Sequence, residues 1–148
     1  MSISTKKTSI STTRTQRSNY ASETYGYYFK CSTNELTSEF AETFPEVKQF
    51  NDILNQNPSL RRLYTLVIEN LQLQSHKDAI FFCDKLLTLT DNNPMVVYLM
   101  GECFYHNADY KKVHSLFVKY KLLNYNQNFQ ILAARSLVSS ILSPLTSN

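Results

Sequence analysis

The chain has few of the residues that make tight turns, disulfide frameworks or membrane spans. Its 148 residues include two glycines, four prolines, three cysteines and no tryptophan. So few glycines and prolines argue against an all-β fold, which needs many tight turns. Three cysteines without paired spacing indicate reduced thiols, as in an intracellular protein. There is no apolar run near the roughly 20 residues that a membrane span needs, and the N-terminus of the sequence lacks the apolar stretch of a signal peptide. We therefore expect a soluble protein of the nucleus and cytoplasm that does not bind membranes.

Most of the chain also has little excess of positive or negative charge. The net charge is +3, and the first thirty residues carry five lysines and arginines against one glutamate. The remainder is therefore almost neutral, without the basic stripe typical of a nucleic-acid-binding protein. We expect no nucleic-acid partner, and a weakly basic N-terminal tail that is solvated rather than bound to phosphate.

Aromatic residues are abundant, and a residue pattern recurs after thirty-four positions. The chain has ten tyrosines and nine phenylalanines. Leu63, Leu66, Val67, Ala79, Cys83 and Leu86 recur as Val97, Met100, Gly101, Val113, Phe117 and Tyr120. This period resembles that of the tetratricopeptide (TPR) repeat, a two-helix unit that stacks into a solenoid. The resemblance implies an all-α, right-handed stack of helical hairpins with about two and a half repeats.

Apolar spacing and proline positions divide the chain into four segments. Residues 1–33 are rich in Ser and Thr and too polar to bury a core, so we expect a disordered tail. A helical linker over 34–56, TPR-like repeats over 57–142 and a polar end over 143–148 follow. The repeats predict helices over 58–73, 77–90, 94–106, 109–122 and 127–141. The last of these is expected to end before Pro144.

The pattern predicts a first helix but no second helix for the third repeat. Gly101 predicts a close approach between the two helices of the second repeat, because a side chain there would push them apart. In the third repeat, no second helix covers the apolar face of 127–141. Solenoids need a cap or a neighbour at such a place, so we expect marginal stability that increases on dimerisation.

Four short elements carry a narrower resemblance, which covers roughly residues 60–142. They lie at Ala79 to Lys85, Tyr98 to Tyr105, Lys119 to Leu123 and, most specifically, Leu132 to Arg135. Their order is similar to that in the N-terminal repeats of a TPR subunit of the anaphase-promoting complex, the cell-division-cycle protein sixteen family. The resemblance implies a ubiquitin-ligase scaffold acting in mitosis, whose N-terminal repeats form a homodimer. Members of that family grip an accessory subunit with later repeats, to which the resemblance over residues 60–142 does not extend.

In a TPR stack the first helix of each repeat lines the concave face. The corresponding positions are Arg61, Tyr64, Ile68, Leu71, Met95, Tyr98, Glu102, Tyr105, Phe129 and Leu132. These apolar and aromatic residues suit a protein-binding surface, and we expect them to close a dimer. The alternative is that the N-terminal segment or a flanking helix covers them. The Lys and Asn of a carboxylate clamp are missing, which argues against a receptor for C-terminal tails.

Residues that could carry chemistry are not arranged for it. Cys103 and His106 lie three apart, but His114 falls on the next helix and completes no four-ligand metal set. Cys83 occupies a helix-packing position, where a thiol behaves as a small apolar group. We expect no enzyme activity, no metal and no cofactor.

The sequence therefore predicts a non-catalytic scaffold that binds other anaphase-promoting-complex subunits and pairs with itself. Two alternatives stay open. One is a free-standing TPR adaptor for a short peptide. The other is a shortened copy that regulates the full-length subunit.

Overall fold

A computed structural model describes residues 45–146, and this part of the chain consists of six helices without a strand. They are α4 (Pro45–Gln56), α5 (Pro58–Gln72), α6 (His76–Leu89), α7 (Pro94–His106), α8 (Tyr110–Lys119) and α9 (Gln127–Thr146). The predicted all-α class is confirmed. The tail expected over 1–33 and the start of the linker expected from residue 34 lie outside the described residues.

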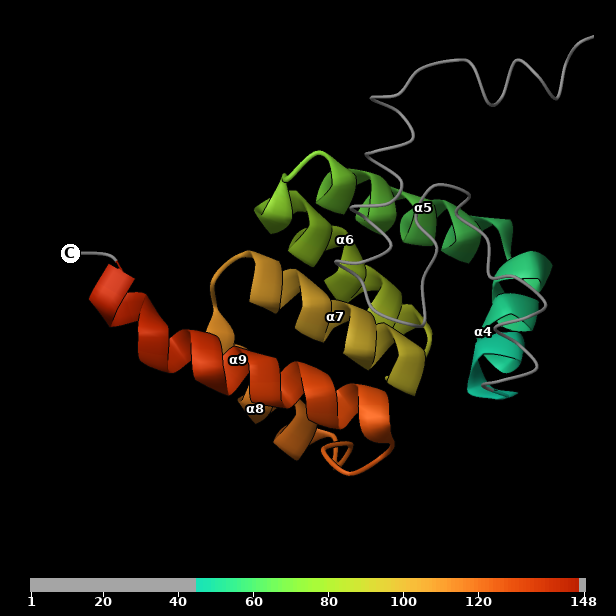
Figure 1. The fold of residues 1–148 in the computed structure, drawn as a ribbon. Helices are drawn as coiled ribbons and strands as arrows, with labels where there is room; N and C mark the ends of the chain where they lie inside the picture. The colour runs from blue at the N-terminus through green and yellow to red at the C-terminus, as the bar shows by residue number, and fades with distance from the viewer. Residues whose placement is uncertain (1–44, 147–148) are drawn as a thin grey trace, which may run out of the picture.

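The helices form a stack in which each contacts the next along the chain. α5 packs on α6 and α7 on α8, while α6 contacts α7 and α8 contacts α9 (Figure 1). α7 also contacts α9, and α4 contacts both α5 and α7. Consecutive helical hairpins that pack side by side are the arrangement expected of TPR-like repeats. Within residues 45–146, no helix is both long and apolar enough to cross a membrane.

The turns inside the two hairpins contain equivalent backbone hydrogen bonds. The amide of Ser75 donates to the carbonyl of Asn70 at 2.8 Å, and thirty-four residues later Asp109 donates to Phe104 at 2.8 Å. The preceding residues, Gln74 and Ala108, have φ values of 61° and 64°. A left-handed residue followed by this long-range bond is the Schellman motif that ends helices. The sequence repeat is thus also a repeat of backbone hydrogen bonds.

Asparagine and proline start the helices where the sequence predicted. The Asn93 side chain accepts from the amide of Met95 at 2.9 Å, which caps α7, and Pro94 follows. The Asn126 side chain accepts from the amide of Asn128 at 2.9 Å and caps α9. Asn57 precedes Pro58 but does not cap α5 with its side chain, which instead donates to the carbonyl of Ile53 at 2.8 Å.

Two helix ends differ from the prediction. The helix expected over 109–122 ends at Lys119, because Lys121 takes a φ of 60° and Leu122 donates back to the carbonyl of Phe117 at 2.8 Å. The helix expected to end before Pro144 continues through that residue to Thr146. Proline removes one backbone donor, and here α9 ends two residues after it instead of before it.

Gly101 lies where α7 meets α8, as the sequence predicted, and α9 also approaches it. A methyl group added there would lie 2.8 Å from Cζ of Phe117 and 3.3 Å from Cδ2 of Leu132. Phe117 in turn packs against Phe129 of α9, with ring centroids 4.9 Å apart. This cluster joins the last three helices into one buried core.

Candidate protein-interaction surface

The ten residues predicted to line the concave face lie on α5, α7 and α9, and most of them are buried. Arg61 and Tyr105 are half-buried, while the other eight are buried. The structure brings several together: Tyr98 of α7 contacts Phe129 of α9 with centroids 5.3 Å apart. Their role in binding a partner stays a prediction. In this structure they do not form an open surface.

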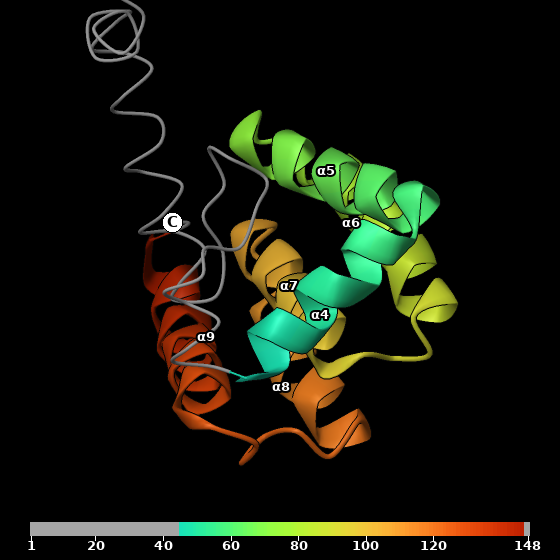
Figure 2. The ribbon, with the colours of Figure 1, turned by 90° about the vertical axis from the view of Figure 1, so that its right-hand side faces the viewer.

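Helix α4 covers part of this face, which is one of the alternatives that the sequence left open. Its apolar residues Val47, Phe50 and Leu54 are buried. The Phe50 ring meets Tyr64 of α5 edge to face at 5.8 Å. Figure 2 shows α4 lying diagonally between α5 and the start of α9. The segment predicted as a linker is therefore a packed element that fills one end of the concave face.

Polar contacts fasten both ends of α4. At its start, Asn126 donates to the Glu46 carboxylate at 3.0 Å, which ties α4 to the loop before α9. Partial burial, and then the Glu46 charge, raises the pKa of Tyr125 in the same loop. Further along, the Arg61 guanidinium donates to Asn51 at 3.4 Å and also to Asn55. α4 is thus held by side-chain hydrogen bonds as well as by Phe50.

Glu102 is the most unusual of the predicted residues, because its carboxylate is fully buried. Neither oxygen has a hydrogen-bond partner among the described residues, and His106 Nε2 lies 3.5 Å from Oε1. The His106 ring stacks on His76 with centroids 6.3 Å apart. Partial burial, and then the charge of His106, lowers the pKa of His76. A buried carboxylate is costly without a cation, and the His106 ring is the basic group that the structure places beside it.

Cys83 and Cys103 face each other between α6 and α7, and both thiols are buried and free. Cys83 Sγ lies 3.8 Å from the carbonyl of Val96, to which it donates. Burial, and then contact with Cys83, raises the pKa of Cys103 well above its ordinary value. The predicted burial of Cys83 is confirmed, and such thiols are inert. Among residues 45–146, no group of three His, Cys, Asp or Glu side chains could hold a metal ion.

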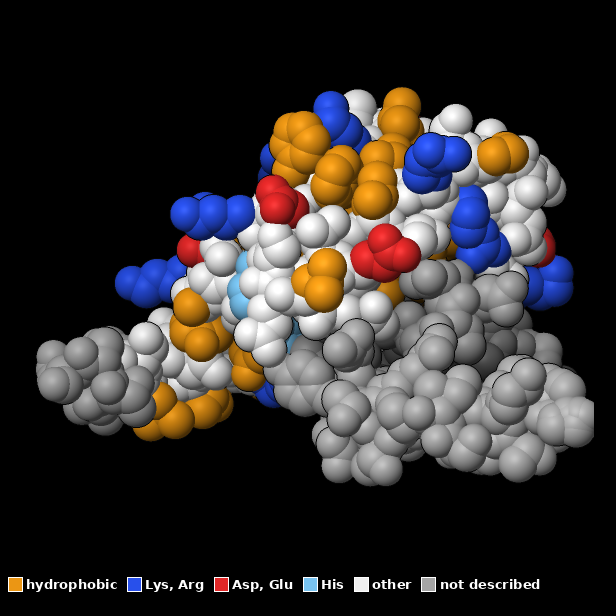
Figure 3. Space-filling view, turned by 90° about the horizontal axis from the view of Figure 1, so that it is seen from above, with side chains coloured by type: hydrophobic (Ala, Val, Ile, Leu, Met, Phe, Trp, Pro, Cys, Tyr) orange, Lys and Arg blue, Asp and Glu red, His pale blue; other side chains and the backbone are white. Residues whose placement is uncertain are grey.

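The most exposed apolar surface lies on α9, where the sequence predicted an uncovered face. Ile131, Ala134, Val138, Ile141 and Leu142 follow one side of this helix and are exposed, Val138 at 55% and Ile141 at 70%. We call these five residues the α9 stripe. Figure 1 shows that the C-terminal half of α9 projects beyond α7 and α8. Figure 3 shows hydrophobic side chains along the projecting end. The predicted uncovered face is confirmed.

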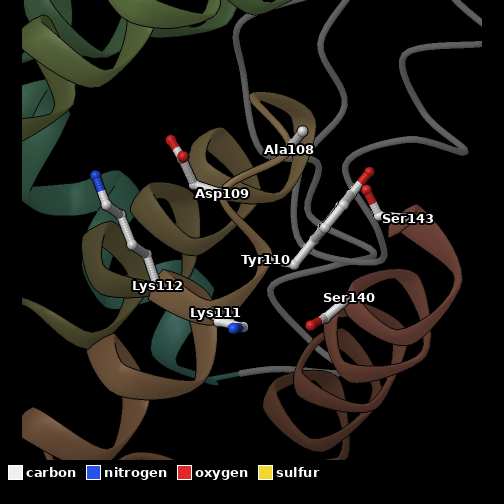
Figure 4. A pocket seen from close by; sticks show the side chains of 7 residues that line it. All are labelled: Ala108, Asp109, Tyr110, Lys111, Lys112, Ser140 and Ser143. Carbon is white, nitrogen blue, oxygen red and sulfur yellow. The ribbon is translucent and has the colours of Figure 1, made fainter. Parts of the chain in front are cut away.

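Two hollows flank α9. One, of about 330 Å³, is lined by Tyr105, Ala134, Arg135, Val138 and Ser139 and adjoins the α9 stripe. The other, of about 360 Å³, lies between the start of α8 and the end of α9. In Figure 4 the hydroxyl groups of Tyr110 and Ser143 point toward each other across it, while Asp109 and Lys112 point away. With Lys112 and Asp109 turned away, the described residues that line this second hollow bring no charged cluster to it.

The residues that the sequence assigned to the concave face on α9 lie on the buried side of that helix. These residues, Phe129 and Leu132, are buried, whereas Ile131 and Val138 are exposed. The available signal was the thirty-four-residue echo itself. Ile131 and Val138 match Val97, which is fully buried, and Phe104, whose ring lies under Lys112 of the following helix. The sequence carried no signal for the hollow beside Tyr105, because that hollow depends on how α9 packs beside α7.

Comparison with known proteins gives one match. The family model described as anaphase-promoting complex, cyclosome, subunit 3, matches residues 72–140, just under half of the chain. The matched region runs from the last residue of α5 through most of α9 and contains α6, α7 and α8 in full. No curated protein and no solved structure matches. The chain is therefore similar to a TPR-type subunit family of the anaphase-promoting complex, without the match singling out the subunit family expected from the sequence.

Proposed function

We propose that the chain is a non-catalytic scaffold module that takes part in assembly of an anaphase-promoting-complex type of ubiquitin ligase. Support comes from the family match over residues 72–140, which covers α6, α7, α8 and most of α9. Helical-hairpin stacks present extended surfaces to other proteins. The role in mitosis, the nuclear and cytoplasmic location and the assignment to the cell-division-cycle protein sixteen family belong to this proposal.

The proposed partners are other subunits of that complex and a second copy of the chain. The dimer was expected to use the concave face, and α4 occupies one end of that face. A dimer through that face therefore requires that its buried residues become accessible. Sedimentation of the purified chain at micromolar concentrations tests this, and a monomer throughout that range would remove the dimer from the proposal.

Affinity purification of the tagged full chain, followed by mass spectrometry, tests the scaffold function. We expect several anaphase-promoting-complex subunits to be enriched over a tag-only control. Enrichment of a single related subunit would instead favour a shortened regulatory copy. Recovery of no subunit of the complex would contradict the proposal.

A further inference from the structure

We propose that the α9 stripe and the hollow beside Tyr105 form a docking site for an amphipathic α-helix of a partner that brings a carboxylate to Arg135. α9 carries apolar residues on all sides, and the C-terminal half of the helix bears no charge. A helix that is apolar all round is normally buried. Here Ile131 is 37% exposed and Val138 is 55% exposed.

The repeat indicates that the occupant is a helix. Val97 on α7 is the counterpart of Ile131 and is fully buried. Gly101, the next position on that face of α7, approaches Phe117 of α8. α5 packs on α6 in the corresponding way. The first helix of each hairpin thus carries this face against a second helix, and α9 offers the same face without one among residues 45–146.

Charge gives the chemistry of the occupant. Arg135 occupies the position that Gly101 has on α7, and its guanidinium lies 4.7 Å from the centre of the Tyr105 ring. It makes no ion pair with a carboxylate in the described part of the chain. The hollow beside it is lined by Tyr105, Ala134, Val138 and Ser139. A partner carboxylate at the position equivalent to Phe117 would face Arg135, since Phe117 faces Gly101.

The same charge pattern argues against a second copy as the occupant. α9 contains Arg135 and no Asp or Glu. Two α9 stripes packed together would place two arginines at one interface with no acid to pair with either. Like charges across an interface oppose association. A separate acidic amphipathic helix supplies both an apolar face for the α9 stripe and a carboxylate for Arg135.

The test uses the purified full chain and two labelled synthetic peptides that copy residues 75–92, the helix that covers α5. One peptide carries Cys83→Glu and the other Cys83→Lys, at the position equivalent to Phe117. Fluorescence anisotropy should show that the Glu peptide binds about tenfold or more tightly than the Lys peptide, because a paired charge replaces a repelled one. Arg135→Glu in the protein should reverse that preference.

Val138→Asp should abolish binding of the Glu peptide. The matched control is Val118→Asp on α8, where the valine is 51% exposed, and it should bind normally. Equal affinity for both peptides, binding of neither, or equal loss in both valine variants would overturn the proposal. Self-association that Val138→Asp alone removes would assign the stripe to a second copy and also overturn it.

This docking site adds a specific binding surface to the proposed scaffold function. It depends on that proposal in one respect, which is that the protein has a partner. Peptide binding by the purified chain is measured apart from recovery of ligase subunits, so either can fail while the other holds.

Discussion

Replacing Gly101 with alanine separates packing from helix propensity, because the two predict opposite signs. In a free helix, Gly→Ala stabilises by about 1 kcal/mol. In this chain the new methyl group would lie 2.8 Å from Cζ and 3.0 Å from Cε1 of Phe117. The Phe117 ring is fully buried and has Phe129 at a centroid distance of 4.9 Å, so it has little room to move.

Overpacking of this kind costs about 1 to 3 kcal/mol. After the helix-propensity gain is subtracted, Gly101→Ala should lower the free energy of unfolding by about 1 kcal/mol. The assay is urea unfolding followed by circular dichroism, where the midpoint should fall without a change in slope. Ser115→Ala, at an exposed position of α8, is the control and should not lower the midpoint. An increase in the stability of Gly101→Ala would refute the close contact between α7 and α8.

Three further predictions concern α4, a histidine pair and a helix end. Phe50→Ala should lower the free energy of unfolding by about 3 to 5 kcal/mol in urea, because it removes a fully buried ring that packs on Tyr64. His76→Gln should flatten the fall in stability below pH 6.5, since partial burial, and then the charge of His106, lowers the pKa of His76 in the folded state and the unfolded chain binds the proton more readily. Ala108→Gly should raise the stability by about 1 kcal/mol in the same assay, because Ala108 has a φ of 64°.

Each of these has a matched comparison. Phe81→Ala removes a ring that is 55% exposed, and a loss as large as that of Phe50→Ala would contradict the packing of α4. Urea titrations across pH 5 to 8 compare wild type with His76→Gln, and parallel curves would show that His76 is not responsible. Ser140→Gly places glycine inside α9 instead of at a helix end and should destabilise, in contrast to Ala108→Gly.

Local chemistry made the hairpin stack predictable. Pro58 and Pro94 fix two helix starts to the residue, and the thirty-four-residue echo fixes the length of each hairpin. The end of α8 was not predictable from the same echo, because Lys121 closes it one turn early with a left-handed backbone. Pro144 was misleading for a related reason, since a single missing donor near the end of α9 does not stop the helix.

The candidate surface was less predictable than the fold. The spacing of Val47, Phe50 and Leu54 shows that the first described helix has an apolar face, but spacing carries no information on what that face meets. Its contact with Tyr64 closed one end of the face that the sequence assigned to partners. Arg135 was visible as a departure from Gly101, yet its place over Tyr105 depends on packing between α7 and α9.

The most direct test of the account compares affinity purifications of three tagged full-length chains: wild type, Val138→Asp and Val118→Asp. The account predicts that wild type and Val118→Asp recover several anaphase-promoting-complex subunits and that Val138→Asp recovers far fewer. If wild type recovered no subunit of the complex, the scaffold function would be contradicted. Equal recovery by all three would contradict the role of the α9 stripe.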